Sequence, residues 1–282
     1  MAGFPADTPE TIPLSDPLDP RIAAYGAIRE RDLVGREGLF VAEGKVVLEM
    51  LLASAACRPQ SLLIAAHRIE ALAPLLARVP EGVPIYAAAQ PVIDAIAGFP
   101  LHRGIVAIGR RIDAPDAEAL LARLPARADI LLLSAIANHD NMGGIFRNAA
   151  AFGAGAILLD ADCCDPLYRK AIRVSVGAAL LVPFARIPRG EDPLALLVRH
   201  GFGAIALSPA GEETLAGLVP AERNAVLLGA EGPGLAPALL ARTRGVRIPM
   251  APGFDSLNVA TTSGIVLHHL AAATAEARIA RP

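Results

Sequence analysis

The sequence predicts an α/β protein of two domains, and three observations support this prediction. At 282 residues the chain exceeds the usual size of a single domain. Strand-like and helix-like segments alternate almost from end to end, which is typical of parallel sheets flanked by helices. The segment Ile130–Leu133 is an uninterrupted apolar run, as expected of a strand that is buried on both faces in the middle of such a sheet.

The first half of the chain predicts a small α/β domain at residues 21–111. Residues 1–20 are rich in Pro, Asp and Thr and are predicted to form a disordered tail. The expected strands are Leu39–Val41, Ser61–Ala65, Pro84–Ala87 and Gly104–Ile108. The expected helices are Ile22–Asp32, Glu43–Ala53, Ile69–Ala77 and Pro91–Ala97.

Residues 112–128 carry scattered Pro, Asp and Arg and are predicted to be a linker with room for one helix. A second α/β domain is predicted at residues 129–282, with a long apolar helix running to about Ala277. Its expected strands are Ile130–Leu133, Ala156–Leu159, Leu180–Pro183, Ala204–Leu207, Val226–Leu228 and Val246–Ile248.

The composition argues against several classes of protein. Although 54% of the residues are hydrophobic, no apolar run approaches the roughly 18 residues that span a bilayer, and the N-terminus lacks a signal-peptide pattern. We therefore expect a cytoplasmic protein with no membrane partner. Cys57, Cys163 and Cys164 have no metal-ligand spacing, so we expect reduced thiols, partly buried, and no metal.

The net charge of −2 and the sequence pI near 6.3 do not by themselves predict nucleic-acid binding. The basic residues are almost all arginine, which suits bidentate contacts to phosphate but can equally reflect composition. The net charge and the arginine content therefore neither favour nor disfavour RNA binding.

A first candidate site follows the Ile130–Leu133 strand. Asn141 and Gly153 are good helix start and stop signals, which predicts a helix over Met142–Phe152. Arg147 projects away from its apolar face, beside Gly143 and Gly144 on the helix surface. The two glycines either clear space around the guanidinium or allow close helix packing, and the sequence favours neither.

Two further candidate sites lie near the C-terminus. Gly229-Ala230-Glu231-Gly232-Pro233-Gly234-Leu235 follows an apolar strand, and its glycines let backbone amides face a ligand. Taken alone, Glu231 can be a solvated turn carboxylate or a partner of Arg147 or of a ligand amine. Ser256 and Asn258 precede the last helix, which either of them can cap. His268 and His269 lie within that helix without acidic residues at ligand spacing, so we expect them to pack.

Taken together, these strings resemble the SpoU (TrmH-like) family of RNA ribose 2′-O-methyltransferases, in the SPOUT superfamily. The first family motif matches Asn141, Gly143 or Gly144, and Arg147-Asn148-Ala149. The second matches Gly229 to Leu235, and the third Ile248-Pro249-Met250 with Ser256-Leu257-Asn258-Val259. Asp165–Ala171 and Ser175–Ala178 resemble the middle segment of the family. The resemblance covers about Leu131 to Ala273, with Asn148 where Thr is common and Ala260-Thr261-Thr262 where Ser-Val-Ala is frequent.

More loosely, Arg36–Gly44 and His102–Ile105 resemble the L30e-like substrate-binding domain that many members carry. The resemblance implies an RNA partner, a homodimer and a deep trefoil knot in the C-terminal domain. It further implies that S-adenosylmethionine binds in the knot, and that Arg147 reaches the pocket near the subunit boundary. The cofactor-binding residues implied are Leu228, Gly229, Glu231, Gly232, Gly234, Ile248, Met250, Leu257 and Asn258.

The implied reaction is transfer of the sulfonium methyl to a ribose 2′-hydroxyl of rRNA, with tRNA as the alternative. The implied catalytic residues are Arg147, Asn141, Glu231, Ser256 and Asn258. Because a guanidinium stays protonated at neutral pH, we interpret Arg147 as an orienting and alkoxide-stabilising group rather than a base. A non-catalytic RNA-binding or ribosome-assembly protein of the same fold is the competing class. A Rossmann oxidoreductase is disfavoured, because no Gly-x-Gly-x-x-Gly follows a strand.

Overall fold

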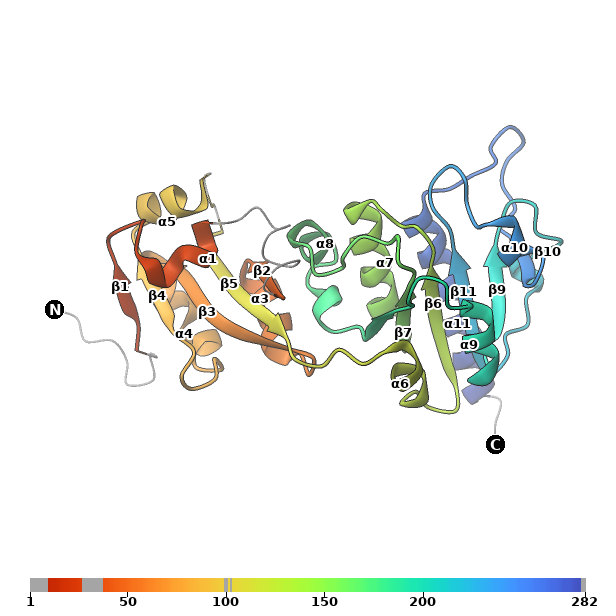
Figure 1. The fold of residues 1–282 in the computed structure, drawn as a ribbon, viewed down its shortest axis with the longest axis horizontal. Coiled ribbons are helices and arrows are strands. Elements are labelled where there is room, and N and C mark those ends of the chain that lie inside the picture. Colours follow the sequence, from red (N-terminus) through yellow and green to blue (C-terminus); the bar gives the residue numbers. More distant parts are fainter. Residues whose placement is uncertain (1–9, 27–37, 99–100, 102, 280–282) are drawn as a thin grey trace. The chain divides into compact units, whose positions relative to one another are not determined.

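The computed structural model describes residues 10–26, 38–98, 101 and 103–279, and the chain divides into two compact units. One unit comprises Met1–Asp113 and Leu167–Leu181, and the other Ala114–Pro166 and Val182–Pro282 (Figure 1). The division after Asp113 falls inside the predicted linker. The sequence does not predict that Leu167–Leu181 belongs to the first unit.

The first unit contains a mixed five-stranded sheet in the order β1-β4-β3-β5-β2, in which β5 runs antiparallel to β3 and β2. Its strands are β1 (Ile12–Leu14), β2 (Leu39–Glu43), β3 (Cys57–Ala65), β4 (Ile85–Ala88) and β5 (Ile105–Arg111). Its α-helices are α1 (Ala23–Gly26), α3 (Lys45–Ala53), α4 (Ile69–Leu76), α5 (Gln90–Ala97) and α8 (Arg169–Val174). Short 3-10 turns occur at Pro20–Ile22, Ala66–Arg68 and Ala178–Leu180.

The prediction that residues 1–20 form a disordered tail is wrong for the second half of that range. Ile12–Leu14 forms the edge strand β1, which pairs in parallel with β4, and Leu14 is buried. An apolar Ile-Pro-Leu segment can add an edge strand despite its proline, because Pro is tolerated at a sheet edge. Residues 1–9, the C-terminal part of the expected Ile22–Asp32 helix, the Arg36-Glu37 start of the loose signature and His102 lie outside the described residues.

The segment Leu167–Leu181 is held in the first unit by side-chain contacts from α8 and the turn after it. Arg169 pairs with Glu43 at 2.6 Å, and their side chains are only 16% and 11% exposed. The Ser54 hydroxyl, which is buried, donates to the Leu180 carbonyl at 2.5 Å. These bonds join residues 126 positions apart in the sequence, which explains why local patterns did not reveal them.

The second unit contains an all-parallel seven-stranded sheet in the order β10-β12-β9-β11-β6-β7-β8. Its strands are β6 (Ala128–Leu133), β7 (Ala156–Leu159), β8 (Phe184–Arg186), β9 (Gly203–Leu207), β10 (Glu213–Thr214), β11 (Arg223–Leu228) and β12 (Arg244–Arg247). Its α-helices are α6 (Ala117–Ala122), α7 (His139–Phe152), α9 (Pro193–Arg199), α10 (Pro237–Leu240) and α11 (Val259–Ile279), with a 3-10 turn at Leu215–Gly217. The predicted α/β class with a parallel sheet is confirmed.

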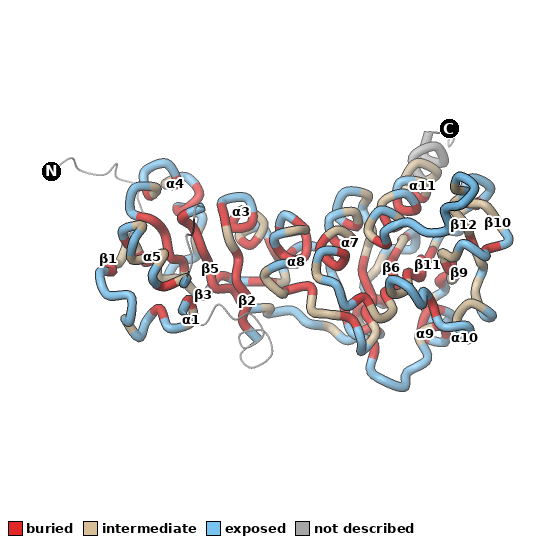
Figure 2. The backbone as a smooth tube through the Cα atoms, turned by 90° about the horizontal axis from the view of Figure 1, so that it is seen from above, coloured by how far each residue is buried: buried red, intermediate tan, exposed pale blue. Residues whose placement is uncertain are grey.

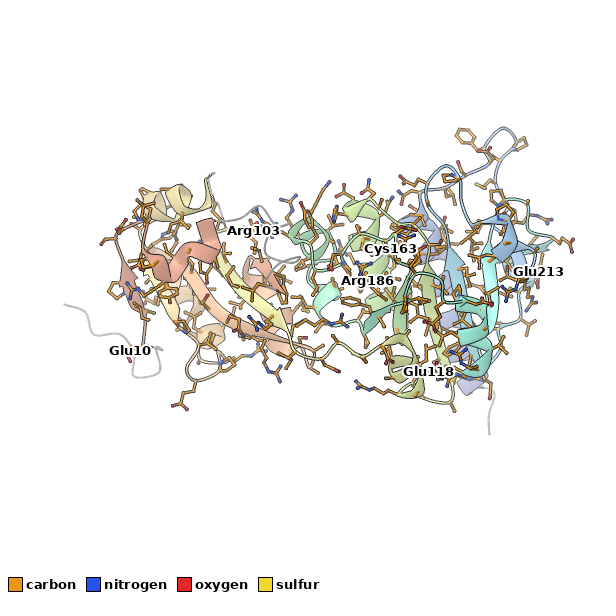
Figure 3. All side chains as sticks on the ribbon, in the orientation of Figure 1. Glu10, Arg103, Glu118, Cys163, Arg186 and Glu213 are labelled. Atoms are coloured by element: carbon orange, nitrogen blue, oxygen red, sulfur yellow. The ribbon has the colours of Figure 1, made fainter. Side chains whose placement is uncertain are left out.

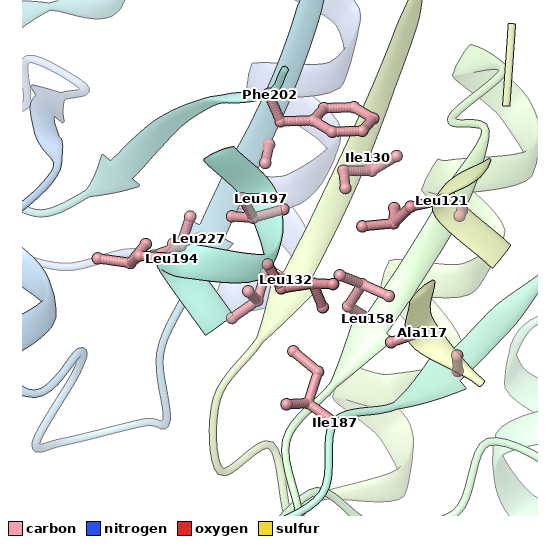
Figure 4. Close-up of a cluster of buried hydrophobic side chains, with 14 of the residues drawn as sticks. Ala117, Leu121, Ile130, Leu132, Leu158, Ile187, Leu194, Leu197, Phe202 and Leu227 are labelled. Atoms are coloured by element: carbon pink, nitrogen blue, oxygen red, sulfur yellow. The ribbon is translucent and has the colours of Figure 1, made fainter. Parts of the chain in front are cut away.

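Helices cover both faces of this sheet. Figure 2 shows α7 and α11 on one side of β6, β11 and β9, and α9 and α10 on the other. On the second face, Ile130 and Leu132 of β6 pack with Leu121 of α6 and Leu197 of α9 in one buried cluster (Figure 4). Alternate residues of β6 point to the opposite face, so the whole strand is buried, as its apolar sequence predicts.

One predicted strand is misplaced. Leu180–Pro183 was expected as a strand, but Leu180 ends a 3-10 turn and β8 starts at Phe184. Gly177, at φ +85°, opens that turn, and Pro183 has no N–H to donate to a sheet ladder. The carbonyl of Pro183 still accepts a bond from the Ile157 amide at 2.9 Å, so the strand begins directly after the proline.

Helix α7 begins three residues earlier than predicted. Its N-cap is Asn138, whose side chain accepts a hydrogen bond from the Asp140 amide at 2.7 Å, so the predicted cap role of Asn141 is wrong. Gly153 ends the helix in the left-handed conformation at φ +72°, as predicted. Because Asn141 lies inside the first turn rather than at the cap, its side chain is available for contacts with other segments.

Helices α7 and α11 approach closely at Gly144. A Cβ built on Gly144 would lie 2.7 Å from the Cβ of Ala260, so this glycine allows close helix packing. One helical turn further along α7, the side chain of Asn148 donates to the Ala260 carbonyl at 2.7 Å and to the Ser263 hydroxyl at 3.0 Å. Of the two interpretations of Gly144, the structure therefore supports the packing role.

We expect Gly144→Val to lower the free energy of unfolding by about 1–3 kcal/mol, because the larger side chain overpacks this contact. Urea denaturation measures the change. Ala151→Val, an exposed position on the same helix, is the matched control for helix propensity. Equal stabilities of the two variants would contradict the close packing of α7 against α11.

The three cysteines are free, with Cys57 and Cys163 buried and Cys164 partly buried, as predicted. Burial raises the pKa of Cys163 to about 12, and the Asp160 charge adds to that effect. Burial likewise raises the pKa of Cys164 to about 11, followed by the charge of Asp165. Both thiols are therefore protonated at neutral pH. In the part of the chain that the structure describes, no group of three metal-ligating side chains exists and no helix is long and apolar enough to cross a membrane.

Candidate methyl-donor site

The candidate site is a cavity of about 200 Å³ at the carboxyl edge of the seven-stranded sheet. Three parallel strands end there. The walls come from the ends of these strands and the turns after them. They comprise residues 207–209 from β9, residues 228–232 and Gly234 from β11, and Ile248 and Met250 after β12. Ser256, Leu257, Val259 and Thr262, at and before the start of α11, close the cavity. Ligand sites in open α/β sheets characteristically occur at this edge.

The charge of this cavity limits what it can bind. Among the described residues that line it, Glu231 carries the only charged side chain, and no arginine or lysine is present. A dinucleotide or other phosphorylated cofactor needs cationic side chains or a free helix N-terminus directed at its phosphates. A largely apolar cleft with one carboxylate instead suits a cationic ligand with an apolar ring system.

The Gly229–Leu235 turn owes its shape to a close approach within the turn itself. A Cβ on Gly229 would lie 2.3 Å from the carbonyl carbon of Gly234, so no other residue fits there. The Gly234 amide donates to the Ala230 carbonyl at 3.0 Å, and Gly232 and Gly234 have φ of +86° and +68°. The conformation of this loop therefore requires glycine at position 229. The loop places Glu231 at the cavity.

Two asparagine side chains from distant segments meet the carboxylate of Glu231. The side-chain nitrogen of Asn141 donates to the Glu231 carboxylate at 2.7 Å, across 90 residues of sequence. The side-chain nitrogen of Asn258 donates to the side-chain oxygen of Asn141 at 2.8 Å and to Glu231 at 3.3 Å. The remaining oxygen of Asn258 accepts from the amides of Ala260 and Thr261 at 2.9 and 3.2 Å, which caps α11. All three sequence motifs are thus joined through one hydrogen-bonded network.

The structure brings most of the predicted cofactor-binding residues into one cavity. Those that line it are Leu228, Gly229, Glu231, Gly232, Gly234, Ile248, Met250 and Leu257, together with the predicted catalytic Ser256. Asn258 does not line it and reaches it only through the hydrogen bond to Glu231. Asn141 is 5% exposed and lies behind Glu231.

Arg147 is the predicted site residue that the structure does not bring to the cavity. Its side chain is exposed on α7 and is not among the lining residues. The neighbouring groove, between α7 and α11, is lined by Asn148, Phe152, Thr261, Gly264, Ile265 and His268. The His268 ring packs edge-on against Phe152, and His269 bonds to the Leu218 carbonyl at 2.9 Å, so both histidines pack as predicted.

The sequence interpretation missed the contribution of β9. Leu207, Ser208 and Pro209 line the cavity, as do Val259 and Thr262 in the first turn of α11. The strand Ala204–Leu207 was expected, and its carboxyl end meets those of β11 and β12 at the same sheet edge. The missing information was strand order, since β9 lies between β11 and β12.

The chain is similar in sequence to known proteins over the segment that contains the cavity. The family model of the SpoU rRNA Methylase family matches residues 129–268, which contain the whole cavity. A protein named uncharacterized tRNA/rRNA methyltransferase from Mycobacterium bovis is 40% identical over 263 residues, covering 90% of this chain and 89% of that protein. The chain belongs to the SpoU methylase family.

Further relatives of this SpoU methylase extend the comparison. The 23S rRNA (guanosine-2′-O-)-methyltransferase RlmB of Escherichia coli is 30% identical over 193 residues, covering 66% of this chain and 78% of that protein. The crystal structure of an AdoMet-bound rRNA methyltransferase from Sinorhizobium meliloti has a TM-score of 0.76 at 23% identity, over 92% of this chain and 97% of that one. This second likeness establishes that this SpoU methylase shares its fold with a solved rRNA methyltransferase.

Proposed function

We propose that this SpoU methylase transfers a methyl group from S-adenosylmethionine to a ribose 2′-hydroxyl in structured RNA, with rRNA favoured over tRNA. The observation that carries the proposal is the cavity whose only charged lining residue, Glu231, is hydrogen-bonded to Asn141 and lies beside Asn258. The names of the relatives, a tRNA/rRNA methyltransferase and a 23S rRNA guanosine 2′-O-methyltransferase, agree with it.

The residues present fit S-adenosylmethionine. The apolar side chains of Leu228, Ile248 and Leu257 suit the adenine ring, and backbone groups at the strand ends suit its polar edge. Glu231 suits the positive charges that the cofactor carries. When bound, S-adenosylmethionine supplies an electrophilic methyl group on a sulfonium. The related rRNA methyltransferase of Sinorhizobium meliloti was solved with AdoMet bound.

The side chains of this protein then act on the RNA hydroxyl. As the 2′-oxygen forms its new C–O bond, the C–S bond breaks and its electron pair stays on sulfur, while the hydroxyl proton passes to water. Arg147 orients the hydroxyl and stabilises the negative charge that develops on its oxygen. Asn141, Glu231, Ser256 and Asn258 complete the hydrogen-bond shell. Positioning supplies most of the rate enhancement, because the sulfonium is already reactive.

Arg147 acts in this proposal from the second subunit of a homodimer. Its exposed position on α7, away from the residues that line the cavity of its own chain, supports this arrangement. The apolar groove between α7 and α11, with Ile265 37% exposed, provides a surface for the partner. The proposal includes the deep trefoil knot of the C-terminal domain.

The remaining parts of the proposal concern the domains of the chain and the location of the protein in the cell. We assign residues 129–282 to the SPOUT methyltransferase domain and residues 21–111 to an L30e-like RNA-binding domain, joined by a linker at 112–128. The mixed sheet of the first unit is compatible with this assignment. Action on ribosomal or transfer RNA implies a cytoplasmic location.

A transfer assay tests the proposed function. Purified protein is incubated with methyl-tritiated S-adenosylmethionine and unmodified 23S rRNA or tRNA transcripts, and the labelled nucleoside is identified after digestion. We expect a 2′-O-methyl nucleoside, and calorimetry should detect binding of S-adenosylhomocysteine but not of NAD. Cofactor binding without transfer to either RNA would favour the non-catalytic class instead. Mapping 2′-O-methyl sites in RNA from cells that lack the protein identifies the natural target.

A further inference from the structure

A second cavity lies on the other side of the Asn141–Glu231 hydrogen bond. It measures about 250 Å³ and is lined by residues 135–138 together with Asn141, Ala230 and Glu231. Ala230 and Glu231 also line the methyl-donor cavity, so the two cavities share a wall. At about 250 Å³ it is slightly larger than the methyl-donor cavity of about 200 Å³, so it offers room for a second ligand beside the donor.

The floor of this second cavity is a strained turn. Ala135 has φ of 55°, one of only two positive values at non-glycine residues among those described. For a residue with a Cβ this conformation costs roughly 1–2 kcal/mol, so it persists only where surrounding contacts impose it. Backbone strain beside a catalytic network is a common feature of functional sites.

Residues 160–164, which follow β7, impose that conformation. The Asp160 carboxylate accepts from the Ser134 hydroxyl at 2.8 Å and from the Ala135 amide at 2.9 Å. The Cys163 sulfur accepts from the Ile136 amide at 3.4 Å, and the Cys164 amide donates to the Ile136 carbonyl at 2.9 Å. The turn is therefore bonded at three consecutive residues. We refer to these contacts as the Asp160 clasp.

The Asp160 clasp is itself supported from β8. The Arg186 guanidinium donates to the Cys163 carbonyl at 3.0 Å and to the Cys164 carbonyl at 3.3 Å. Figure 3 labels the side chains of Arg186 and Cys163 on the ribbon. It also lies 3.7 Å from the Asp165 carboxylate. None of these residues lines either cavity. Their bonds act on the second cavity through Ala135 and Ile136, which line it.

We propose that the second cavity receives the acceptor nucleoside of the RNA, and that Asp160 is a positioning residue that shapes it. This inference rests on the proposed methyl transfer, which requires donor and acceptor to meet at one point. Glu231 faces both cavities, and Asn141 joins its carboxylate from the acceptor side. A ribose in the second cavity thus presents its 2′-hydroxyl to the network that also borders the donor.

Filling the second cavity tests this proposal. Ala137 is exposed and lines it, whereas Ala216 is an exposed alanine of the same unit that lines neither cavity. In the transfer assay with a 23S rRNA transcript, Ala137→Phe is expected to raise the KM for RNA by about tenfold or more, equivalent to about 1.4 kcal/mol of lost binding. Ala216→Phe should leave the KM unchanged. Both variants should bind S-adenosylhomocysteine like the wild type. An unchanged KM in Ala137→Phe would overturn the proposal.

Hydrogen exchange separates a failure of this inference from a failure of the proposed function. Addition of the same transcript should protect the amides of Ala137 and Asn138 in the wild type and not in Ala137→Phe, whereas those of Ala135 and Ile136 are already hydrogen-bonded to Asp160 and Cys163. Absence of methyl transfer together with this protection would refute the reaction and retain the site. Methyl transfer by the wild type without this protection would refute the site and retain the reaction.

The role of Asp160 is tested by a matched pair of substitutions. Asp160→Ala removes the acceptor of three hydrogen bonds, from Ser134, Ala135 and Asp162, and should raise the KM for RNA more than it lowers kcat. Asp160→Asn keeps one acceptor oxygen for Ser134 and Ala135, loses only the bond from the Asp162 amide, and should restore the KM to within about threefold of wild type, a difference of less than about 1 kcal/mol. If both variants lower kcat equally with no change in KM, Asp160 has only a structural role.

Discussion

Replacing Arg147 with alanine is expected to lower kcat for methyl transfer by about 100- to 1,000-fold, the usual effect of removing a donor to a developing oxyanion. Affinity for S-adenosylhomocysteine should stay unchanged, because Arg147 is exposed and lines neither cavity of its own chain. Single-turnover transfer to a 23S rRNA transcript measures the first effect and calorimetry the second. Arg242→Ala, which removes an exposed arginine paired with Asp192, is the control. Full activity of Arg147→Ala would refute the assigned role.

A mixing experiment extends this prediction to the dimer. Leu257→Trp should fill the methyl-donor cavity, since Leu257 lines it and is 42% exposed. A mixed dimer of Arg147→Ala and Leu257→Trp chains contains one intact site if Arg147 acts across the subunit boundary, and none if it acts within its own chain. We therefore expect activity from the mixture although each variant alone is inactive. An inactive mixture, with mixed dimers demonstrated by mass spectrometry, would exclude action across the boundary.

Asn258 has two functions, and two substitutions separate them. Asn258→Ala should lower the free energy of unfolding by about 1 kcal/mol, because it removes the cap of α11. Asn258→Asp keeps the capping oxygen and should retain wild-type stability. Both variants lose the bond to Asn141, and Asn258→Asp also places a second carboxylate beside Glu231. We expect both to lose activity, by about 100-fold for two or more hydrogen bonds of about 1.4 kcal/mol each.

Urea denaturation and the transfer assay together distinguish the two functions of Asn258. A stable but inactive Asn258→Asp protein would show that activity depends on the network and not only on the helix cap. Wild-type activity in Asn258→Asp would mean that the Asn141–Glu231–Asn258 network is dispensable.

The local features of the fold were predictable because they depend on nearby residues. The apolar run at Ile130–Leu133 predicted a central strand, and Gly153 predicted the end of α7. One error arose where two residues of the same type competed for one role. Asn138 and Asn141 can both cap a helix, and only the buried surroundings of Asn141 show that it points elsewhere.

The contacts of Leu167–Leu181 could not have been predicted in the same way. The Glu43–Arg169 ion pair and the Ser54–Leu180 bond each join positions 126 residues apart. Their formation depends on where the chain returns after β7, which no local pattern encodes. The same reason explains why the strand Ala204–Leu207 was predicted but its place at the cavity was not.

The sequence by itself determined the α/β class, the parallel sheet and the family, because strand and cap patterns are local and three linked motifs are specific. It also indicated two candidate sites near the C-terminus, at Gly229–Leu235 and at Ser256 and Asn258. Only the tertiary structure decided that Asn141 and Asn258 meet Glu231, that Arg147 is exposed and does not line the cavity of its own chain, and that Asp160 holds a strained turn. These contacts depend on strand order and on long-range packing, which the linear pattern of residues does not specify.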